Sequence, residues 1–259
     1  MIIMENTTSK TPIMIGIGVI IAVLIALGVW FLYTIISPKP ESQYNPAQNS
    51  NTNIPEDNYQ GTVFFSVTDA AMDAGVINNI DISIDKLELH SQSQGWITVL
   101  QTSHTFSLLD LKAKNQVVLL EKVNAIVDIY DKVRLRVAKV MVTESGYASE
   151  AKLPSNELTM NGTVKVLPNS SSSVEFDFLA LESIHKTSKG EFIFVPVVKF
   201  ESRSNATVQV DADNTVVASN GNVDDTMTLG MDINGEMKNN FRINTNVNLE
   251  INNGIIKIR

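Results

Sequence analysis

The chain has 259 residues, a net charge of −8 and no cysteine. The lack of cysteine excludes disulfide bonds, lipid attachment through a thiol and thiolate catalysis. If the protein lies outside the cytoplasm, a cysteine-free chain of this size favours a bacterial or archaeal origin. The acidic balance without a basic patch argues against nucleic acid as a partner.

An uncharged apolar run extends from Ile13 to Ile36. As a helix, 24 residues would reach roughly 36 Å, enough to cross a bilayer core of about 30 Å. A cleaved signal peptide would have an apolar region of about 7–15 residues and a small-x-small cleavage site, which the sequence after Ile36 lacks. The run therefore predicts one uncleaved transmembrane signal-anchor over residues 13–36 in the cell membrane.

Basic residues decide the orientation of the span only weakly, because Lys10 precedes it and Lys39 follows it. In the simplest arrangement, residues 1–12 form a short cytoplasmic N-terminus, and the chain after the span lies outside the cell membrane. Small residues recur every four positions at Gly18, Ala22 and Ala26, so a homo-oligomer through this helix face is a hypothesis. The alternative is an ordinary span, in which small residues are common.

Residues 37–60 contain four prolines among Asn, Ser and Gln. Because this composition offers little to bury, it predicts a disordered linker that spaces the following domain from the bilayer.

Alternating apolar residues then predict an all-β fold, an antiparallel β-sandwich over residues 61–203. The alternation changes parity once within Ile80–Leu89 and once within Val133–Val142. One extra residue that returns the apolar side chains to the same face is typical of a β-bulge. Two bulged strands in related positions of the fold are therefore expected.

Three further segments of this domain are interpreted from their patterns. Thr105–Leu111 predicts a strand, whereas Lys114–Ala125 fits either a strand end or a short helical turn. Phe192–Phe200 is apolar on both faces and predicts a strand buried between layers. Pro196 lacks a backbone donor, which predicts a bulge or a sheet edge at that point.

Residues 204–259 predict a C-terminal β-hairpin or meander extension. Asn234-Gly235 and Asn253-Gly254 lie between alternating apolar runs, and this dipeptide is a strong hairpin signal because both residues accept positive φ. The apolar face of the extension needs cover, either from the preceding domain or from another chain.

An ordered set of short motifs over residues 61–200 resembles the DUF4382 family of bacterial and archaeal envelope proteins. The motifs are Gly61-Thr-Val, Val67-Thr-Asp-Ala, Ile82-Ser-Ile, Gly95-Trp96, Leu108-Leu-Asp-Leu, Tyr130-x-x-Val-Arg-Leu, Gly162-Thr-Val, Phe176-Asp-Phe and Phe192-x-Phe-x-Pro-Val-Val. The resemblance implies an all-β extracytoplasmic domain of unknown function, with no established activity.

The sequence contains no nucleophile motif, no phosphate-binding loop outside the apolar run and no zinc-binding helix motif, so it assigns no catalytic residue and no cofactor site. The three histidines, His90, His104 and His185, are widely spaced and are interpreted as solvated surface residues. Acids that share loops are candidate Ca²⁺ ligands, with turn-building acids as the alternative. These candidates are Asp69, Asp73, Asp211, Asp213, Asp224 and Asp225.

Three glycosylation sequons begin at Asn161, Asn169 and Asn205, all in predicted loops or turns of the outer domain. The sequons agree with an outer location of this domain.

Together, the apolar run, the linker and the β domain predict a single-pass, membrane-anchored extracytoplasmic module. Its expected role is binding or structural, with an envelope glycan or protein as the partner. The alternative is a subunit of a surface assembly that pairs through strand edges. A glycan-active enzyme is the least favoured class, because no catalytic motif was found.

Overall fold

The computed structural model describes residues 59–69, 76–244 and 247–259. The predicted span Ile13–Ile36, its small residues proposed for helix contact and nearly all of the predicted linker lie outside these ranges. Among the described residues, no helix is both long and apolar enough to cross a membrane.

The first of two large sheets, sheet A, has the strand order β16-β15-β12-β9-β1-β5. Its strands are β1 (Gln60–Thr68), β5 (Val118–Ile126), β9 (Ser171–Phe178), β12 (Val197–Ser204), β15 (Asn222–Met231) and β16 (Met237–Asn239). Neighbours are antiparallel except β1 and β9, which run parallel. The predicted all-β class is confirmed, and the prediction of an entirely antiparallel arrangement is wrong at this pair.

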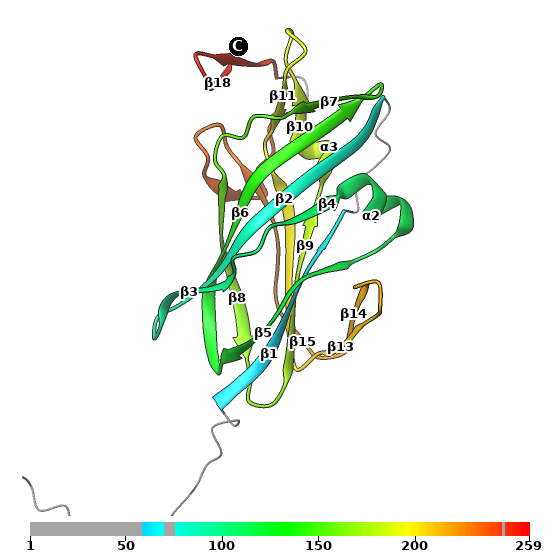
Figure 1. The fold of residues 1–259 in the computed structure, drawn as a ribbon. Coiled ribbons are helices and arrows are strands. Elements are labelled where there is room, and N and C mark those ends of the chain that lie inside the picture. The colour runs from blue at the N-terminus through cyan, green and yellow to red at the C-terminus, as the bar shows by residue number, and fades with distance from the viewer. Residues whose placement is uncertain (1–58, 70–75, 245–246) are drawn as a thin grey trace, which may run out of the picture. The chain divides into compact units, whose positions relative to one another are not determined.

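The second sheet, sheet B, has the order β3-β2-β6-β7, with β4 also paired to β2 and β8 also paired to β6 (Figure 1). Its strands are β2 (Ile77–Ser91), β3 (Gly95–Leu100), β4 (His104–Ser107), β6 (Asp128–Glu144), β7 (Tyr147–Glu150) and β8 (Glu157–Val166). Three hairpins and two short helices complete the described fold. They are β10 (Ile184–Lys186) with β11 (Phe192–Phe194), β13 (Thr207–Val210) with β14 (Val216–Ser219), β17 (Leu249–Asn252) with β18 (Ile255–Ile258), α2 (Leu108–Lys114) and α3 (Ala180–Ser183).

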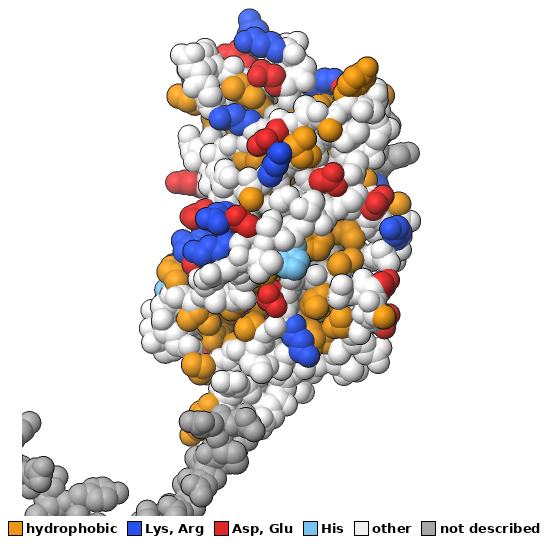
Figure 2. Space-filling view, in the orientation of Figure 1, with side chains coloured by type: hydrophobic (Ala, Val, Ile, Leu, Met, Phe, Trp, Pro, Cys, Tyr) orange, Lys and Arg blue, Asp and Glu red, His pale blue; other side chains and the backbone are white. Residues whose placement is uncertain are grey.

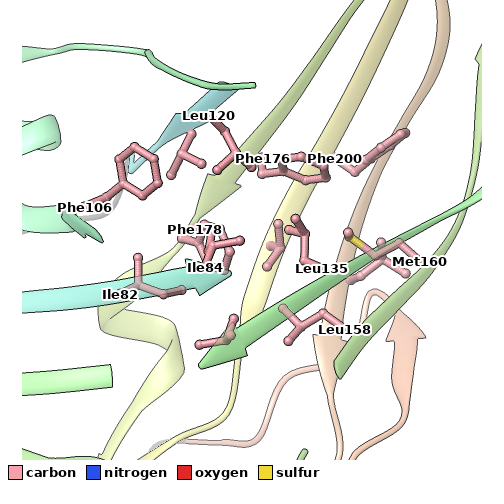
Figure 3. Close-up of a cluster of buried hydrophobic side chains, with 14 of the residues drawn as sticks. Ile82, Ile84, Phe106, Leu120, Leu135, Leu158, Met160, Phe176, Phe178 and Phe200 are labelled. Atoms are coloured by element: carbon pink, nitrogen blue, oxygen red, sulfur yellow. The ribbon is translucent and has the colours of Figure 1, made fainter. Parts of the chain in front are cut away.

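The two sheets share one hydrophobic core. Period-2 alternation directs one set of side chains from each strand inward, and Figure 3 shows such side chains of both sheets in the space between them. Phe176 of β9 lies between Phe65 and Phe200, with ring centroids 6.4 and 6.0 Å away, and all three rings are fully buried. The apolar pattern of the sequence therefore becomes a single core rather than two.

The two predicted β-bulges are confirmed, and they lie opposite each other. Strands β2 and β6 pair along most of their length; Ser83 pairs with Lys139, whereas Ile84 pairs with Val137. Ala138 is thus the extra residue of β6, and Asp85 is the extra residue of β2. The apolar residues on both sides of each bulge are fully buried, as the change of parity required.

Two strand predictions are wrong in part. The segment predicted as a strand over Thr105–Leu111 is a strand only to Ser107 and then helix α2, because the Ser107 hydroxyl accepts a hydrogen bond from the Asp110 N–H and caps the helix. The predicted strand Phe192–Phe200 is two strands that belong to different sheets. The chain breaks at Val195 and Pro196, where proline has no N–H to continue a ladder.

The free edge of β8 is closed by side chains of sheet A. The Thr163 N–H donates to Asp225 (2.9 Å), and the Ser202 hydroxyl donates to the Thr163 carbonyl (2.5 Å). The Ser172 hydroxyl donates to the Lys165 carbonyl (2.6 Å). Backbone groups of an edge strand that would otherwise be buried without partners are satisfied in this way.

Residues 204–259 are part of this fold, because β15 lies inside sheet A between β12 and β16. Turns form at both predicted dipeptides, and at Asn253-Gly254 both residues have positive φ. The long alternation predicted after Gly235 is wrong in part, because residues 241–244 have no regular structure and the next strand begins at Leu249. Ile243, Leu249 and Ile256 are nevertheless buried in the common core.

Candidate functional site

A cleft of about 640 Å³ lies at the end of the domain that carries β7, β11 and β18 (Figure 1). Four segments form it: the bulge of β6, the chain around β7, the turn between β10 and β11, and the C-terminal hairpin. Its volume falls within the range of small-ligand sites. The lining residues are Ala138, Ser149, Glu150, Ala151, Lys152, Leu153, Asn156, Lys189, Gly190, Glu191, Phe192, Ile251 and Gly254.

Backbone hydrogen bonds fix two walls of this cleft to each other. The Lys152 N–H donates to the Phe192 carbonyl (2.9 Å), and the Phe194 N–H donates to the Lys152 carbonyl (2.8 Å). Gly190, with φ of 84°, turns the chain so that Lys189 and Glu191 stand at the rim. The β6 bulge places the exposed Ala138 in the cleft wall, so a feature that the sequence predicted also shapes this site.

The charged groups of the cleft are not all paired with one another. Glu150 is paired with Lys139 (3.5 Å). Among the described residues, neither Lys152 nor Lys189 has a carboxylate within 4.0 Å. The lining also carries Glu191 in addition to Glu150, so its formal charges balance, and the two ammonium groups are the places where an anion would bind. Figure 2 shows basic and acidic side chains close together at this end of the molecule.

The outer face of sheet B carries a second group of polar residues, but these are paired with one another. The Arg134 guanidinium lies 4.1 Å from the centroid of the Trp96 ring and donates to Glu88 (2.7 Å). Lys86 also contacts Glu88 (2.7 Å). Burial alone would raise the pKa of Glu88, but hydrogen bonds from Lys86 and Arg134 outweigh it and hold the pKa below its usual value. The charged side chains of this face therefore already have partners within the protein, so fewer of its polar groups are available to a ligand than in the cleft.

The turn between β2 and β3 is fixed to the start of β6. His90 contacts Asp131 (2.6 Å), and the Asp128 carboxylate accepts hydrogen bonds from Ser93 (2.5 Å) and Gln94 (3.1 Å). The hydrogen bond from Ser93 and those of its neighbours lower the pKa of Asp128 to about 2.

Asp128 is expected to stabilise the fold at neutral pH and to lose this effect in acid. Because its folded pKa lies below the ordinary value, the stabilisation is complete above about pH 4 and disappears as the pH falls toward about 2. With a discount for solvent screening, Asp128→Asn is expected to lower the free energy of unfolding by about 1 kcal/mol at pH 7. Urea titrations at neutral and acid pH measure the difference. The effect should shrink in a Ser93→Ala background, and equal stabilities at pH 7 would contradict it.

The structure does not bring the three histidines together. His90 lies at the β2–β3 turn, His104 stacks on Phe106 with ring centroids 6.4 Å apart, and His185 is buried on β10. The interpretation of His185 as a solvated surface residue is wrong, and burial lowers the pKa of its imidazole. In the ranges that the structure describes, no three His, Asp or Glu side chains are grouped as metal ligands.

The candidate Ca²⁺ ligands that the structure describes do not form one group, and Asp224 and Asp225 lie on strand β15 rather than in a shared loop. Asp69, after β1, accepts from the Ala180 N–H (3.4 Å), and Asp213 accepts from the Thr215 N–H (3.1 Å), which lowers the pKa of Asp213. Asp211 is exposed in the same β13–β14 turn as Asp213. Asp224 contacts Lys165 (3.2 Å), and the neighbouring Asp225 accepts the hydrogen bond from the Thr163 N–H. Asp73 lies outside the described residues, and calcium binding stays a prediction.

The three sequon asparagines are exposed. Asn169 and Asn205 occupy turns and have φ of 53° and 52°. The prediction that Asn161 lies in a loop or turn is wrong, because Asn161 is within strand β8, opposite Lys132. Its side chain lies on the outer face because the neighbouring Met160 points into the core.

These observations define an all-β domain with two large sheets, one core and an open cleft whose lining carries both basic and acidic side chains. The chain belongs to the family described as "Domain of unknown function (DUF4382)", which matches residues 60–196, more than half of the chain. No curated protein and no solved structure matches it. The cleft residues Lys152, Lys189 and Glu191 were not singled out from the sequence, because no spacing links them.

Proposed function

We propose that the chain is a single-pass, membrane-anchored module of the cell envelope, and that its cleft binds an acidic segment of an envelope polysaccharide. The uncharged run Ile13–Ile36 supports the anchor, and the cysteine-free chain supports a bacterial or archaeal surface. The cleft is lined by residues around β7, β11 and β18, and Figure 1 shows these strands at the end of the domain remote from the start of β1. An anchored domain of this shape would hold the cleft away from the bilayer. The proposal assigns no catalytic activity.

The observation that carries the ligand class is the pair of lysines without carboxylate partners, Lys152 and Lys189, at the rim of the cleft. Ammonium groups form charge-assisted hydrogen bonds with carboxylates, such as those of uronic acids. Ser149 and Asn156 add groups that can bond to hydroxyls. The aliphatic side chains of Leu153 and Ile251 provide surface for the apolar faces of sugar rings.

The test measures binding of the full chain in nanodiscs to matched neutral and uronate-bearing oligosaccharides. Lys152→Glu and Lys189→Glu are each expected to weaken uronate binding by about tenfold or more, which corresponds to about 1.4 kcal/mol. Lys114→Glu reverses an exposed charge on α2, outside the cleft, and should leave binding unchanged. Equal binding of neutral and acidic oligosaccharides, or no effect of either cleft variant, would refute the ligand class.

A surface assembly is the second candidate, favoured by strand β3. Among the described strands, this edge strand has β2 as its one partner, and its sequence Gly-Trp-Ile-Thr-Val-Leu contains no charge and no proline. Natural edge strands usually carry charged residues or proline, which prevent pairing with another chain. Sedimentation of the full chain in detergent, over a wide range of protein concentration, separates an assembling subunit from a monomeric binding module.

A further inference from the structure

Four exposed apolar side chains gather at the end of the domain opposite the cleft. They belong to Tyr59, Ile126, Ile129 and Leu167, with exposed fractions of 56%, 50%, 57% and 38%. We call these four residues the proximal tip, because strand β1 begins beside them at Gln60. Figure 2 shows hydrophobic side chains at this lower end of the view.

Backbone contacts place the four residues at the same end of the domain. The Val127 N–H donates to the Tyr59 carbonyl (2.7 Å), and Gln60 pairs with Ile126 across β1 and β5. On the other side of β6, Ile129 pairs with Lys165, near the end of β8 that leads to Leu167. Leu167 in turn lies against β1, since a Cβ on Gly61 would be 2.4 Å from the Leu167 carbonyl.

The surroundings of the tip are polar, and of the charged residues beside Ile129, Lys165 is paired with Asp224 (3.2 Å). A hollow of about 370 Å³ beside the tip is lined by uncharged polar residues and one glycine: Gln60, Gly61, Thr62, Asn124, Asn169, Ser170 and Ser171. The nearby Asp128 carboxylate already accepts hydrogen bonds, one of them from the Ile129 N–H (2.7 Å). An apolar centre within a polar rim whose charged groups already have partners suits the headgroup boundary of a bilayer, where tyrosine is favoured.

We propose that the proximal tip docks on the surface of the bilayer that the preceding segment crosses. This inference rests on the membrane anchor of the proposed function. Residues 37–58 separate the predicted span from Tyr59, and the flexible linker predicted from their composition would have an end-to-end distance of about 25 Å. The tether therefore keeps the tip at a high effective concentration near the membrane, so that weak apolar contacts are sufficient for docking.

Docking would also orient the domain. Strand β6 runs from Asp128, at the tip, to Glu144, which pairs with Tyr147 at the cleft end. Its 17 residues correspond to roughly 55 Å at the rise of an extended strand. A docked tip thus places the cleft tens of ångströms from the lipid surface, where it would face the envelope.

The test uses the absence of native cysteine for a single label on the full chain. An environment-sensitive fluorophore is attached at Ile129→Cys or at Leu167→Cys, and the protein is reconstituted in phosphatidylcholine–phosphatidylglycerol vesicles with or without doxyl-labelled lipid. Both labels are expected to emit at shorter wavelength and to lose most of their fluorescence to the doxyl lipid. A label at Tyr147→Cys, 83% exposed at the cleft end, is the matched control and should lose little.

Two further outcomes decide the proposal. Adding Tyr59→Ser and Ile126→Ser to the Ile129→Cys chain should reduce the quenching, because the apolar contact is removed while the tether remains. Equal quenching at Ile129→Cys and Tyr147→Cys, in vesicles that carry the protein on flotation, would overturn the docking alone. A chain that does not float with the vesicles would overturn the anchor and the docking together, whereas the ligand class of the cleft would still be decided by the binding assay.

Discussion

A chain that ends at Pro196 is expected not to fold cooperatively, although the family match ends at that residue. Truncation there removes β12, β15 and β16 and leaves β9 at the edge of a three-stranded remnant. It also removes Phe200, whose ring packs against Phe176 and lies 2.8 Å from the position of a Cβ on Gly162. Each large apolar side chain lost from the core contributes about 1.5–3 kcal/mol. The sum of such losses is comparable with the whole stability of a domain, about 5–15 kcal/mol.

Urea unfolding followed by circular dichroism measures this effect. The matched control ends at Asn240, after β16, and lacks only the C-terminal segment with the buried Ile243, Leu249 and Ile256. This control is expected to unfold cooperatively at lower urea concentration, since sheet A is complete. A chain ending at Pro196 that unfolded with the slope of the intact protein would contradict the prediction, because the slope reports the surface exposed on unfolding.

The strands with strict alternation were predictable from the sequence alone. A change of parity has one simple physical solution, an extra residue, so the bulges in β2 and β6 followed from the positions of Ile84, Leu87, Val137 and Val140. Alternation carries no information on the direction of the partner strand, however. The parallel pairing of β1 with β9 was therefore missed. It was also not predicted that sheet A combines three strands before Pro196 with three strands after it.

Short apolar runs were ambiguous for a different reason. Leu108, Leu109 and Leu111 fit a strand and one turn of helix equally well, because the run is shorter than two helical turns. The capping residue Ser107 was the available signal, since a Ser three residues before an Asp is typical of a helix start. At β11 and β12 the signal was Pro196, which indicates a bulge or a sheet edge but equally fits a passage of the chain between two sheets.

The candidate site was far less predictable than the fold. Lys152, Lys189 and Ile251 are separated by dozens of residues and come together only because the Lys152 backbone bonds to β11 and the C-terminal hairpin closes the cleft. Acids that are adjacent in the sequence, in contrast, proved to hold the fold together. Asp225 accepts the Thr163 N–H at the free edge of β8, where the closure of two sheets requires a polar acceptor. Proximity in the sequence was thus a poor guide to chemistry in this all-β chain.

Phe176→Ala is expected to cost about 3–5 kcal/mol of unfolding free energy, the range for truncation of a buried aromatic ring. The ring is fully buried on β9, between Phe65 on β1 and Phe200 on β12. Three strands of sheet A and the facing side chains of sheet B would line the cavity, and paired strands cannot close around it easily. The residual cavity should therefore place the cost toward the upper end of this range.

Equilibrium urea unfolding of the full chain in detergent, compared with Phe176→Leu, separates the cavity from the loss of the aromatic ring. The leucine variant retains most of the volume and is expected to lose distinctly less stability than the alanine variant. Tyr147→Ala removes an aromatic ring that is 83% exposed and should change stability by less than about 0.5 kcal/mol. A Phe176→Ala protein as stable as Tyr147→Ala would show that the two sheets do not share the core described above, because a ring outside a shared core leaves no cavity when it is removed.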